Sequence, residues 1–142
     1  MSDNYEPSPW EPIADHVQQY LDTDGEQGGT WEGAPIIVLS TTGAKSGKLR
    51  RTPLIRVKAG DDYLVIASMG GAPSHPNWHH NIVAHPEVTV QDHAEVHEMI
   101  ARTATESERA ELWPAAAAVW PAYDEYVTKT DRVIPLVICS PR

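Results

Sequence analysis

The sequence predicts a mainly β protein in which about six antiparallel strands roll into a small barrel with flanking helices. Two observations support this fold class. Apolar, β-branched runs recur from residue 36 to residue 139 and are separated by short turns rich in Gly, Asp and Pro. Helical patterns are fewer, and they do not alternate with the strands as they would in a parallel α/β sheet.

The N-terminal third is expected to hold an arm and the first strand. Residues 1–35 are rich in Pro, Gly and acid, with one candidate helix at 13–21. We therefore expect an N-terminal arm with a short helix (1–23), followed by a barrel domain (24–142). The run at 36–42 is typical of a buried strand. Two further strand-like runs between 53 and 68 flank Gly60 and Asp61, which predict a hairpin turn.

The second half should contain the remaining strands and helices. A helix is predicted between Pro76 and Pro86, and strands at 88–92 and 94–102. Residues 105–108 read Thr-Glu-Ser-Glu, a capping box that begins a helix, and Pro114 is expected to kink or break that helix. A short helix at 123–128 and a strand at 133–139 follow. The positions expected to face the core are Trp78, Ile82, Val83, Val88, Val90, Val96 and Ile100.

Composition limits the function classes. The chain has 142 residues, 41% hydrophobic, which suits one globular domain. A net charge of −9 opposes binding to nucleic acid or coating of an anionic membrane. Cys139 is the only cysteine, so no internal disulfide can form and a cytoplasmic setting is expected. No run is long enough to span a membrane. A peripheral contact at the inner membrane face is compatible with the sequence, and the oligomeric state is open.

Positive charge is concentrated in one stretch, TTGAKSGKLRRTP at 41–53. It carries four of the eleven Lys and Arg residues, whereas the first 44 residues carry none. One interpretation is a phosphate-binding loop, in which glycines let backbone N–H groups approach an anion. A nucleotide P-loop is excluded, because Gly43 and Gly47 are one residue too close and Leu49 replaces the magnesium-binding hydroxyl. A solvated hairpin tip is the third interpretation, and the anion site and the tip are about equally supported.

Three segments carry a resemblance to a known family. They are GGTWEGAPIIVLSTTGAKSGKLRRTPL, VIASMGGAPSHPNWHHNI and ELWPAAAAVWPAYDEYVTKTDRVIPLVI, and the similarity runs from about residue 24 to the C-terminus. In order and spacing they resemble the deazaflavin-dependent nitroreductases and quinone reductases of actinobacteria, which use reduced coenzyme F420. The resemblance implies a split β-barrel that forms a deazaflavin-binding domain at 24–142.

The resemblance also implies a set of cofactor contacts. In the family the basic loop holds the anionic tail of the coenzyme, and the later segments surround the deazaflavin ring. The implied tail residues are Lys45, Ser46, Gly47, Lys48, Arg50 and Arg51. The implied ring residues are Pro53, Leu54, Ile66, Ala67, Ser68, Met69, Asn77, Trp78, His79, His80 and Asn81.

An aromatic series lies near the C-terminus. Trp120, Tyr123 and Tyr126 are spaced by three and are expected to form one stripe on a helix. Taken alone, such a stripe favours core packing, whereas the family places aromatic side chains here over the reactive ring face. We therefore assign substrate contacts to all three residues, and catalytic contacts to Ser68, Tyr123 and Tyr126.

Other chemistry is less well supported. The adjacent His79 and His80 point about 100° apart on a helix and cannot both face one ion, so no metal site is predicted. No serine lies in a nucleophile-elbow context. Cys139 ends an apolar run and is expected in the core.

The sequence thus predicts an oxidoreductase that transfers a hydride from reduced F420 to a quinone or nitroaromatic acceptor. Two alternatives stay open: a non-catalytic deazaflavin carrier, and an FMN-using split-barrel enzyme. Met69 stands where close relatives are expected to carry a basic residue, and the histidine pair after Trp78 also departs from the family pattern. Both departures leave the natural acceptor open.

Overall fold

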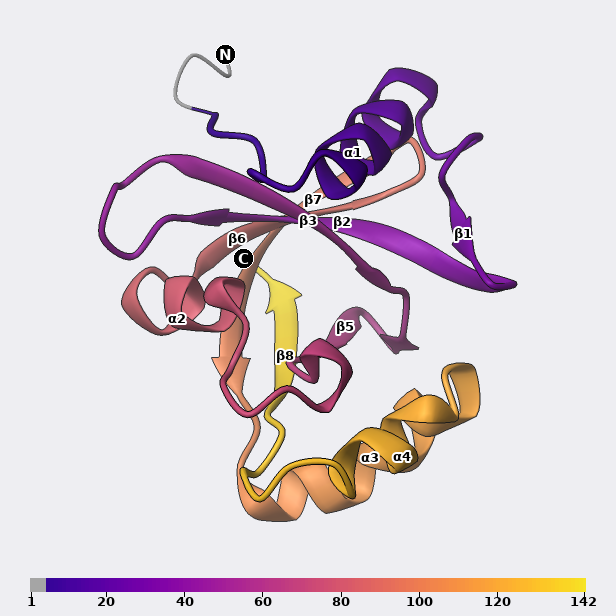
Figure 1. The fold of residues 1–142 in the computed structure, drawn as a ribbon, viewed down its shortest axis with the longest axis vertical. Coiled ribbons are helices and arrows are strands. Elements are labelled where there is room, and N and C mark those ends of the chain that lie inside the picture. Colours follow the sequence, from indigo (N-terminus) through magenta and orange to yellow (C-terminus); the bar gives the residue numbers. More distant parts are fainter. Residues whose placement is uncertain (1–4) are drawn as a thin grey trace.

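The computed structural model describes residues 5–142, so the first four residues of the predicted arm lie outside it. A single curled antiparallel sheet forms the body, and helices flank it (Figure 1). The strands are β1 (Thr30–Trp31), β2 (Ala34–Thr42), β3 (Leu49–Ile55), β4 (Lys58–Ala59), β5 (Asp62–Ile66), β6 (Glu87–Asp92), β7 (Glu95–Thr103) and β8 (Leu136–Pro141). The helices are α1 (Glu11–Thr23), α2 (Asn77–Ala84), α3 (Glu106–Val119) and α4 (Ala122–Val127), with a 3₁₀ turn, η1 (Met69–Gly71).

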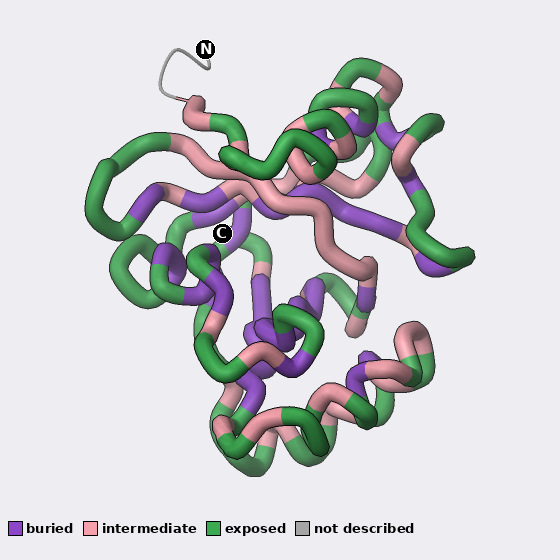
Figure 2. Tube along the Cα trace, in the orientation of Figure 1, coloured by how far each residue is buried: buried purple, intermediate pink, exposed green. Residues whose placement is uncertain are grey.

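The strand order is β1-β2-β6-β7-β8-β5-β4, with β3 paired to β2. This sheet confirms the predicted mainly β, antiparallel class. Three clusters of buried apolar residues lie against this sheet. Buried residues follow several of its strands (Figure 2). The first lies on the concave face, where α2 adds Trp78 and Ile82. The second packs α3 and α4 against β5 and β8, and the third packs α1 against β2.

Helix α1 is packed onto the sheet by Val17 and Tyr20, which are 1% and 0% exposed. The Tyr20 hydroxyl accepts a hydrogen bond from the N–H of His93 at 2.6 Å and lies 3.1 Å from the carbonyl of Ile36. Burial raises the pKa of Tyr20, so it remains a neutral donor. The helix at the predicted 13–21 is therefore confirmed, and it is part of the packed body.

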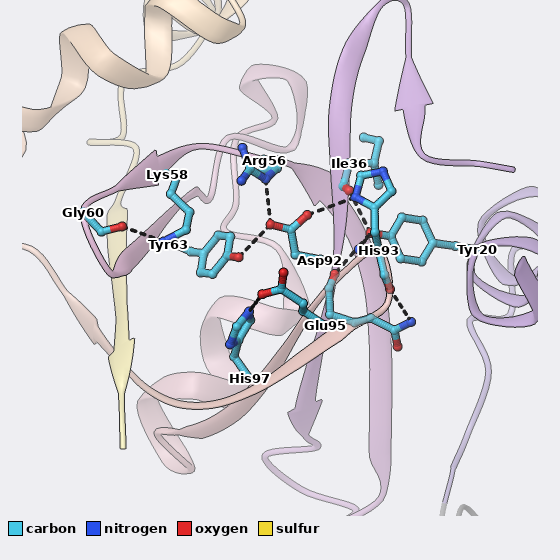
Figure 3. A network of polar contacts seen from close by, with 11 residues as sticks. Tyr20, Ile36, Arg56, Lys58, Gly60, Tyr63, Asp92, His93, Glu95 and His97 are labelled. Atoms are coloured by element: carbon cyan, nitrogen blue, oxygen red, sulfur yellow. Dashed lines mark hydrogen bonds and ion pairs between the residues drawn. The ribbon is translucent and has the colours of Figure 1, made fainter. Parts of the chain in front are cut away.

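A polar network joins the end of β6 to β5 and to the residue that follows β3 (Figure 3). Arg56, just after β3, and Tyr63, on β5, each donate to Oδ2 of Asp92 at 2.7 Å. Burial opposes ionisation of Asp92, but hydrogen bonds from Arg56, Tyr63 and His93 outweigh it and lower the pKa. Asp92 is therefore a carboxylate that ties the end of β6 to both other strands.

The expected phase of β7 is wrong. Met99 and Ala101 face the first core at 1% and 4% exposure, whereas Val96 and Ile100 are 59% and 45% exposed. The register explains this, because Met99 lies opposite Val88 and His97 opposite Val90. The two inward valines of β6 thus fix the odd-numbered residues of β7 as the inner set. Val83, also expected inside, is 68% exposed.

Several boundaries also differ from expectation. Strand β3 begins at Leu49 and pairs with β2, and only the two-residue β4 forms the hairpin with β5. The last strand begins at Leu136, and Val133 is 72% exposed. Helix α3 continues through Pro114, because Trp113 and Ala116 pack against the second core on either side of it. The predicted capping box is confirmed: Thr105 Oγ1 accepts from Glu108 N at 3.2 Å.

Candidate functional site

The loop between β2 and β3 exposes Lys45, Ser46, Gly47 and Lys48. It closes through bonds from Gly43 N to the Lys48 carbonyl at 2.8 Å and from Gly47 N to the Gly43 carbonyl at 3.0 Å. A Cβ at residue 43 would lie 2.5 Å from the Ser46 Oγ, so a larger residue there would displace the Ser46 side chain. The loop therefore presents two lysines on a compact turn.

Arg50 and Arg51 are not on that loop; they belong to β3, which corrects the expectation of a single basic loop. Neighbouring strand residues face opposite sides of a sheet, so the two arginines diverge. Arg50 lies opposite Thr41, and its Nη1 is 3.1 Å from Glu6 Oε1. The Arg51 guanidinium lies over the Tyr5 ring at 4.6 Å. The N-terminal arm thus contacts both arginines.

Helix α2 is fastened to the base of the basic loop by Asn81. Its Oδ1 accepts from the N–H of Ala44 at 2.9 Å, and its Nδ2 donates to Thr41 Oγ1 at 3.1 Å. Asn81 is 8% exposed, so these bonds are shielded from water. The Asn-containing segment and the basic loop, 37 residues apart, therefore form one unit, and Figure 1 shows them on the same side of the sheet.

The histidines around α2 differ in environment. His79 is 8% exposed, and burial together with the nearby His75, His80 and Arg132 lowers its pKa to about 4. Its Nε2 lies 3.3 Å from Thr103 Oγ1, and its Nδ1 is buried with no hydrogen-bond partner in the described residues. Asn77 and His80 are exposed. Within residues 5–142 no cluster of His, Cys, Asp and Glu could hold a metal ion.

The segment after β5 is held by a residue that the sequence interpretation missed, Arg132. Its guanidinium donates to the carbonyls of Ala67, Ser68 and Ala72 at 3.1, 2.7 and 2.8 Å. It also lies 2.8 Å from His75 Nδ1, which must act as the acceptor because arginine only donates. The only sequence signal was a lone arginine, with no motif, in the segment leading to the last strand.

The same segment packs closely against α4. A Cβ at Gly71 would lie 2.9 Å from the Lys129 Cβ and 3.0 Å from the Tyr126 carbonyl oxygen. Residues 68–71 and the Tyr126 turn are therefore neighbours, although more than 50 residues separate them. The two predicted catalytic segments are brought together, as the sequence interpretation requires.

The aromatic series is only partly as expected. Trp120 ends α3, whereas Tyr123 and Tyr126 lie on α4, so the three do not share one helix. They remain in contact: Trp120 Nε1 donates to the Tyr126 hydroxyl at 3.3 Å, and the two tyrosine rings meet edge to face at 6.2 Å. Tyr123 is 5% exposed in the second core, and burial raises its pKa. Tyr123 thus packs mainly inward.

Other predicted ring residues are divided between faces. Leu54 packs on the first core, and Pro53, opposite Val38, lies on the α1 side. Ile66 belongs to the second core and Ala67 to the first. These four side chains therefore do not share one face, and they cannot all point at one flat ring. Ser68 is 7% exposed and Met69 is 54% exposed.

Two surface hollows lie away from these residues. One, of about 550 Å³, lies between α1 and β1 and includes His16 and Trp31. The other, of about 430 Å³, lies beside Tyr63 and His97. Neither hollow includes the basic loop, α2 or Ser68, so the volumes of the hollows do not identify the candidate functional site. The functional candidate is instead the contact series from the basic loop through Asn81, His75 and Arg132 to Ser68 and Tyr126, named here the contact belt.

The contact belt fits an anionic, flat cofactor. Its loop end offers exposed ammonium groups and a glycine-shaped turn, and its other end offers Ser68 beside an aromatic pair. No carboxylate contacts Lys45 or Lys48 in the described residues.

Comparison with known proteins gives the family. A family model described as F420H(2)-dependent quinone reductase matches residues 13–141. An F420H(2)-dependent quinone reductase of Mycobacterium tuberculosis is 33% identical over 136 residues, covering 89% of this chain and 88% of the relative. This chain belongs to the F420H(2)-dependent quinone reductase family. It is an oxidoreductase whose cofactor is reduced coenzyme F420.

Solved structures agree with the fold. An F420-H2-dependent reductase, FDR-A, from Mycobacterium smegmatis is 47% identical with a TM-score of 0.70, covering 75% of this chain and 94% of its own. A second structure, described as a domain-swapped dimer, is 40% identical with a TM-score of 0.73, covering 94% of this chain and all of its own. The predicted split barrel is confirmed. Every helix within residues 5–142 is too short or too polar to span a bilayer.

Proposed function

We propose that this protein reduces a quinone with reduced coenzyme F420 at the contact belt, in the cytoplasm. The family supports the reaction, and one observation supports the location: hydrogen bonds and close packing link the basic loop, α2, Ser68 and Tyr126 into one series. A nitroaromatic compound is the second acceptor class for the same site. The one cysteine is buried and cannot form an internal disulfide, which is compatible with a reducing compartment.

In this proposal the chain's residues bind and orient. Lys45, Lys48 and Arg50 hold the anionic tail, since charge-assisted hydrogen bonds each contribute about 1.5–3 kcal/mol. Arg51 contributes less, because its guanidinium lies over the Tyr5 ring and its side chain faces the other side of the sheet from Arg50. When bound, the cofactor supplies the hydride, and a proton from water completes the hydroquinone.

The acceptor side is assigned to Ser68, Trp120, Tyr123 and Tyr126. Tyr126 and Trp120 form a half-buried aromatic surface beside residues 68–71. Such a surface stacks a flat acceptor and excludes water. The Ser68 and Tyr126 hydroxyls are the donors available for a developing negative charge on the acceptor oxygen. Tyr123 supports Tyr126 from behind, through the ring contact at 6.2 Å.

The test is a titration of the purified protein with F420 and, in parallel, with FMN, followed by turnover of a water-soluble naphthoquinone. A Lys45→Ala, Arg50→Ala double variant should weaken F420 binding by about 2 kcal/mol per residue. Lys58→Ala removes one positive charge at an exposed position outside the belt and should leave binding nearly unchanged.

Three outcomes contradict the proposal. Tail binding is wrong if the double variant keeps its F420 dissociation constant. Equal or tighter binding of FMN favours the FMN-using class. Tight F420 binding without turnover of any quinone or nitroaromatic favours a carrier. The expected F420 affinity falls with rising salt, because the loop lysines are exposed.

A further inference from the structure

All three guanidinium nitrogens of Arg132 donate to carbonyls of one short segment, residues 67–72. Nε donates to the carbonyl of Ala72, Nη2 to that of Ser68, and Nη1 to that of Ala67. These bonds span 60 to 65 residues of sequence, so they tie the segment before β8 to the segment after β5. The planar, rigid fork of a guanidinium can satisfy several acceptors at once, and the single ammonium of lysine cannot reproduce that pattern.

The segment that Arg132 holds has an unusual backbone. Met69, Gly70 and Gly71 have φ values of 46°, 65° and 83°, three left-handed residues in succession. A left-handed methionine is unfavourable, and such conformations persist where surrounding structure fixes them. Here Arg132 binds the carbonyls on one side, and α4 packs against Gly71 on the other. The conformation of residues 67–72 therefore depends on contacts from outside the segment.

Arg132 also sets the direction of the peptide groups. In a trans peptide the C=O and the following N–H point in opposite directions. Because the carbonyls of Ala67 and Ser68 point at Arg132, the N–H groups of Ser68 and Met69 point away from it. Within residues 5–142 neither N–H donates to a backbone or side-chain acceptor. The side of the segment opposite Arg132 thus presents unpaired donors beside the Ser68 hydroxyl.

We propose that Arg132 is a positioning residue for the reduction, which fixes residues 67–72 so that their N–H groups and Ser68 face the cofactor ring. This inference rests on the proposed function, since that function places the ring beside Ser68. Arg132 itself touches neither cofactor nor acceptor in this account. It acts through the backbone that it holds.

Two variants and one control test the inference. Arg132→Ala removes all the carbonyl bonds, and Arg132→Lys keeps the charge but not the fork. Arg109→Ala is the matched control, because Arg109 Nε donates to the Ile134 carbonyl at 2.8 Å and packs on Trp113, away from residues 67–72. Each variant is measured for melting temperature, F420 affinity, kcat and KM, and for amide hydrogen exchange without cofactor.

Both Arg132 variants should lose at least tenfold in kcat/KM per folded molecule, and Arg132→Lys should keep most of its melting temperature. The amides of Gly71 and Ala72, which donate to the carbonyls of Ser68 and Met69, should exchange at least tenfold faster in the cofactor-free variants. Arg109→Ala should show normal kcat/KM and normal exchange at these amides, whatever its melting temperature.

Normal kcat/KM in Arg132→Lys, or an equal loss in Arg109→Ala, overturns the inference. Unchanged exchange at Gly71 and Ala72 in Arg132→Ala overturns it independently of any cofactor. If the unaltered protein neither binds F420 nor reduces a quinone, the proposed function fails and takes the inference with it. If the unaltered protein is active and the Arg132 variants match it, only the inference fails.

Discussion

Asn81 Oδ1 accepts a hydrogen bond from the backbone N–H of Ala44 at 2.9 Å, and this bond joins α2 to the first residue of the exposed part of the basic loop. The same side chain binds Thr41, on β2, with its Nδ2. A single buried amide therefore sets the position of the loop relative to α2.

Asn81→Ala should weaken F420 binding by about tenfold, because removal of the buried amide leaves the Ala44 N–H and the Thr41 hydroxyl without this partner and loosens the loop. Fluorescence titration with F420 measures the effect. Val83→Ala, at an exposed position on the same helix and outside the predicted cofactor contacts, is the control and should bind normally. Equal affinities for the two variants would show that α2 does not position the loop.

Glu6→Gln should strengthen F420 binding by up to about fivefold. The Glu6 carboxylate pairs with Arg50 at 3.1 Å and competes with an anionic tail for it, although exposed pairs of this kind contribute at most about 1 kcal/mol. Glu26→Gln removes the same charge at an exposed site away from Arg50 and controls for net charge. If the two variants bind F420 alike, the arm does not compete for the tail site.

Tyr126→Phe should reduce turnover of quinone and nitroaromatic acceptors with little change in F420 affinity, because it removes a hydroxyl and keeps the ring. Trp120→Ala should mainly raise the acceptor KM, since it removes stacking area. Trp31→Ala, at an exposed position on β1 outside the contact belt, is the control and should leave the acceptor KM unchanged. If the series serves only packing, melting temperatures will fall while activity per folded molecule stays normal.

His79 should make the protein less stable as pH falls from about 6.5 to about 4. Burial lowers its folded-state pKa from 6.5 to about 4, so in that interval the unfolded chain binds a proton that the folded chain excludes. The contribution is fully present above pH 6.5, and its loss reaches at most about 3 kcal/mol near pH 4. Urea unfolding at several pH values measures it.

His79→Gln should remove that part of the pH dependence, and the exposed His80→Gln should keep it. Comparing each variant with the parent cancels the titration of the carboxylates. A parent and a His79→Gln variant with parallel stability curves between pH 6.5 and 4 would mean that His79 is protonated in the folded state.

Local patterns predicted the strands and helices whose signals lie within a few residues. The Thr105 capping box and the apolar runs of β2, β5 and β8 are of this kind. The phase of β7 was not predictable, because Met99 and Ala101 compete with Val96 and Ile100 for the inner face and pairing to β6 decides between them. Pro114 does not break α3, because tertiary packing on both sides holds the helix together.

Some residues of the candidate site were predictable from the sequence, and others were not. Clustered charge singled out Lys45 and Lys48, and the family resemblance singled out Ser68 and Tyr126. Arg132 had no local pattern, since its significance comes from carbonyl groups 60 or more residues earlier in the chain. Every residue carries a backbone carbonyl, so the sequence does not show which carbonyls accept a hydrogen bond. A residue whose main partners are carbonyls is therefore not found by searching for motifs.

The position of β8 has a consequence for synthesis of the protein. This strand, the last in sequence, lies between β5 and β7 and supplies Val137 and Cys139 to one core and Leu136 and Ile138 to another. A nascent chain that has emerged only as far as α4 therefore has two strand edges exposed and two cores incomplete. The sheet can close only after residue 141 has left the ribosome, and until then the free edges of β5 and β7 can pair with a misdirected strand.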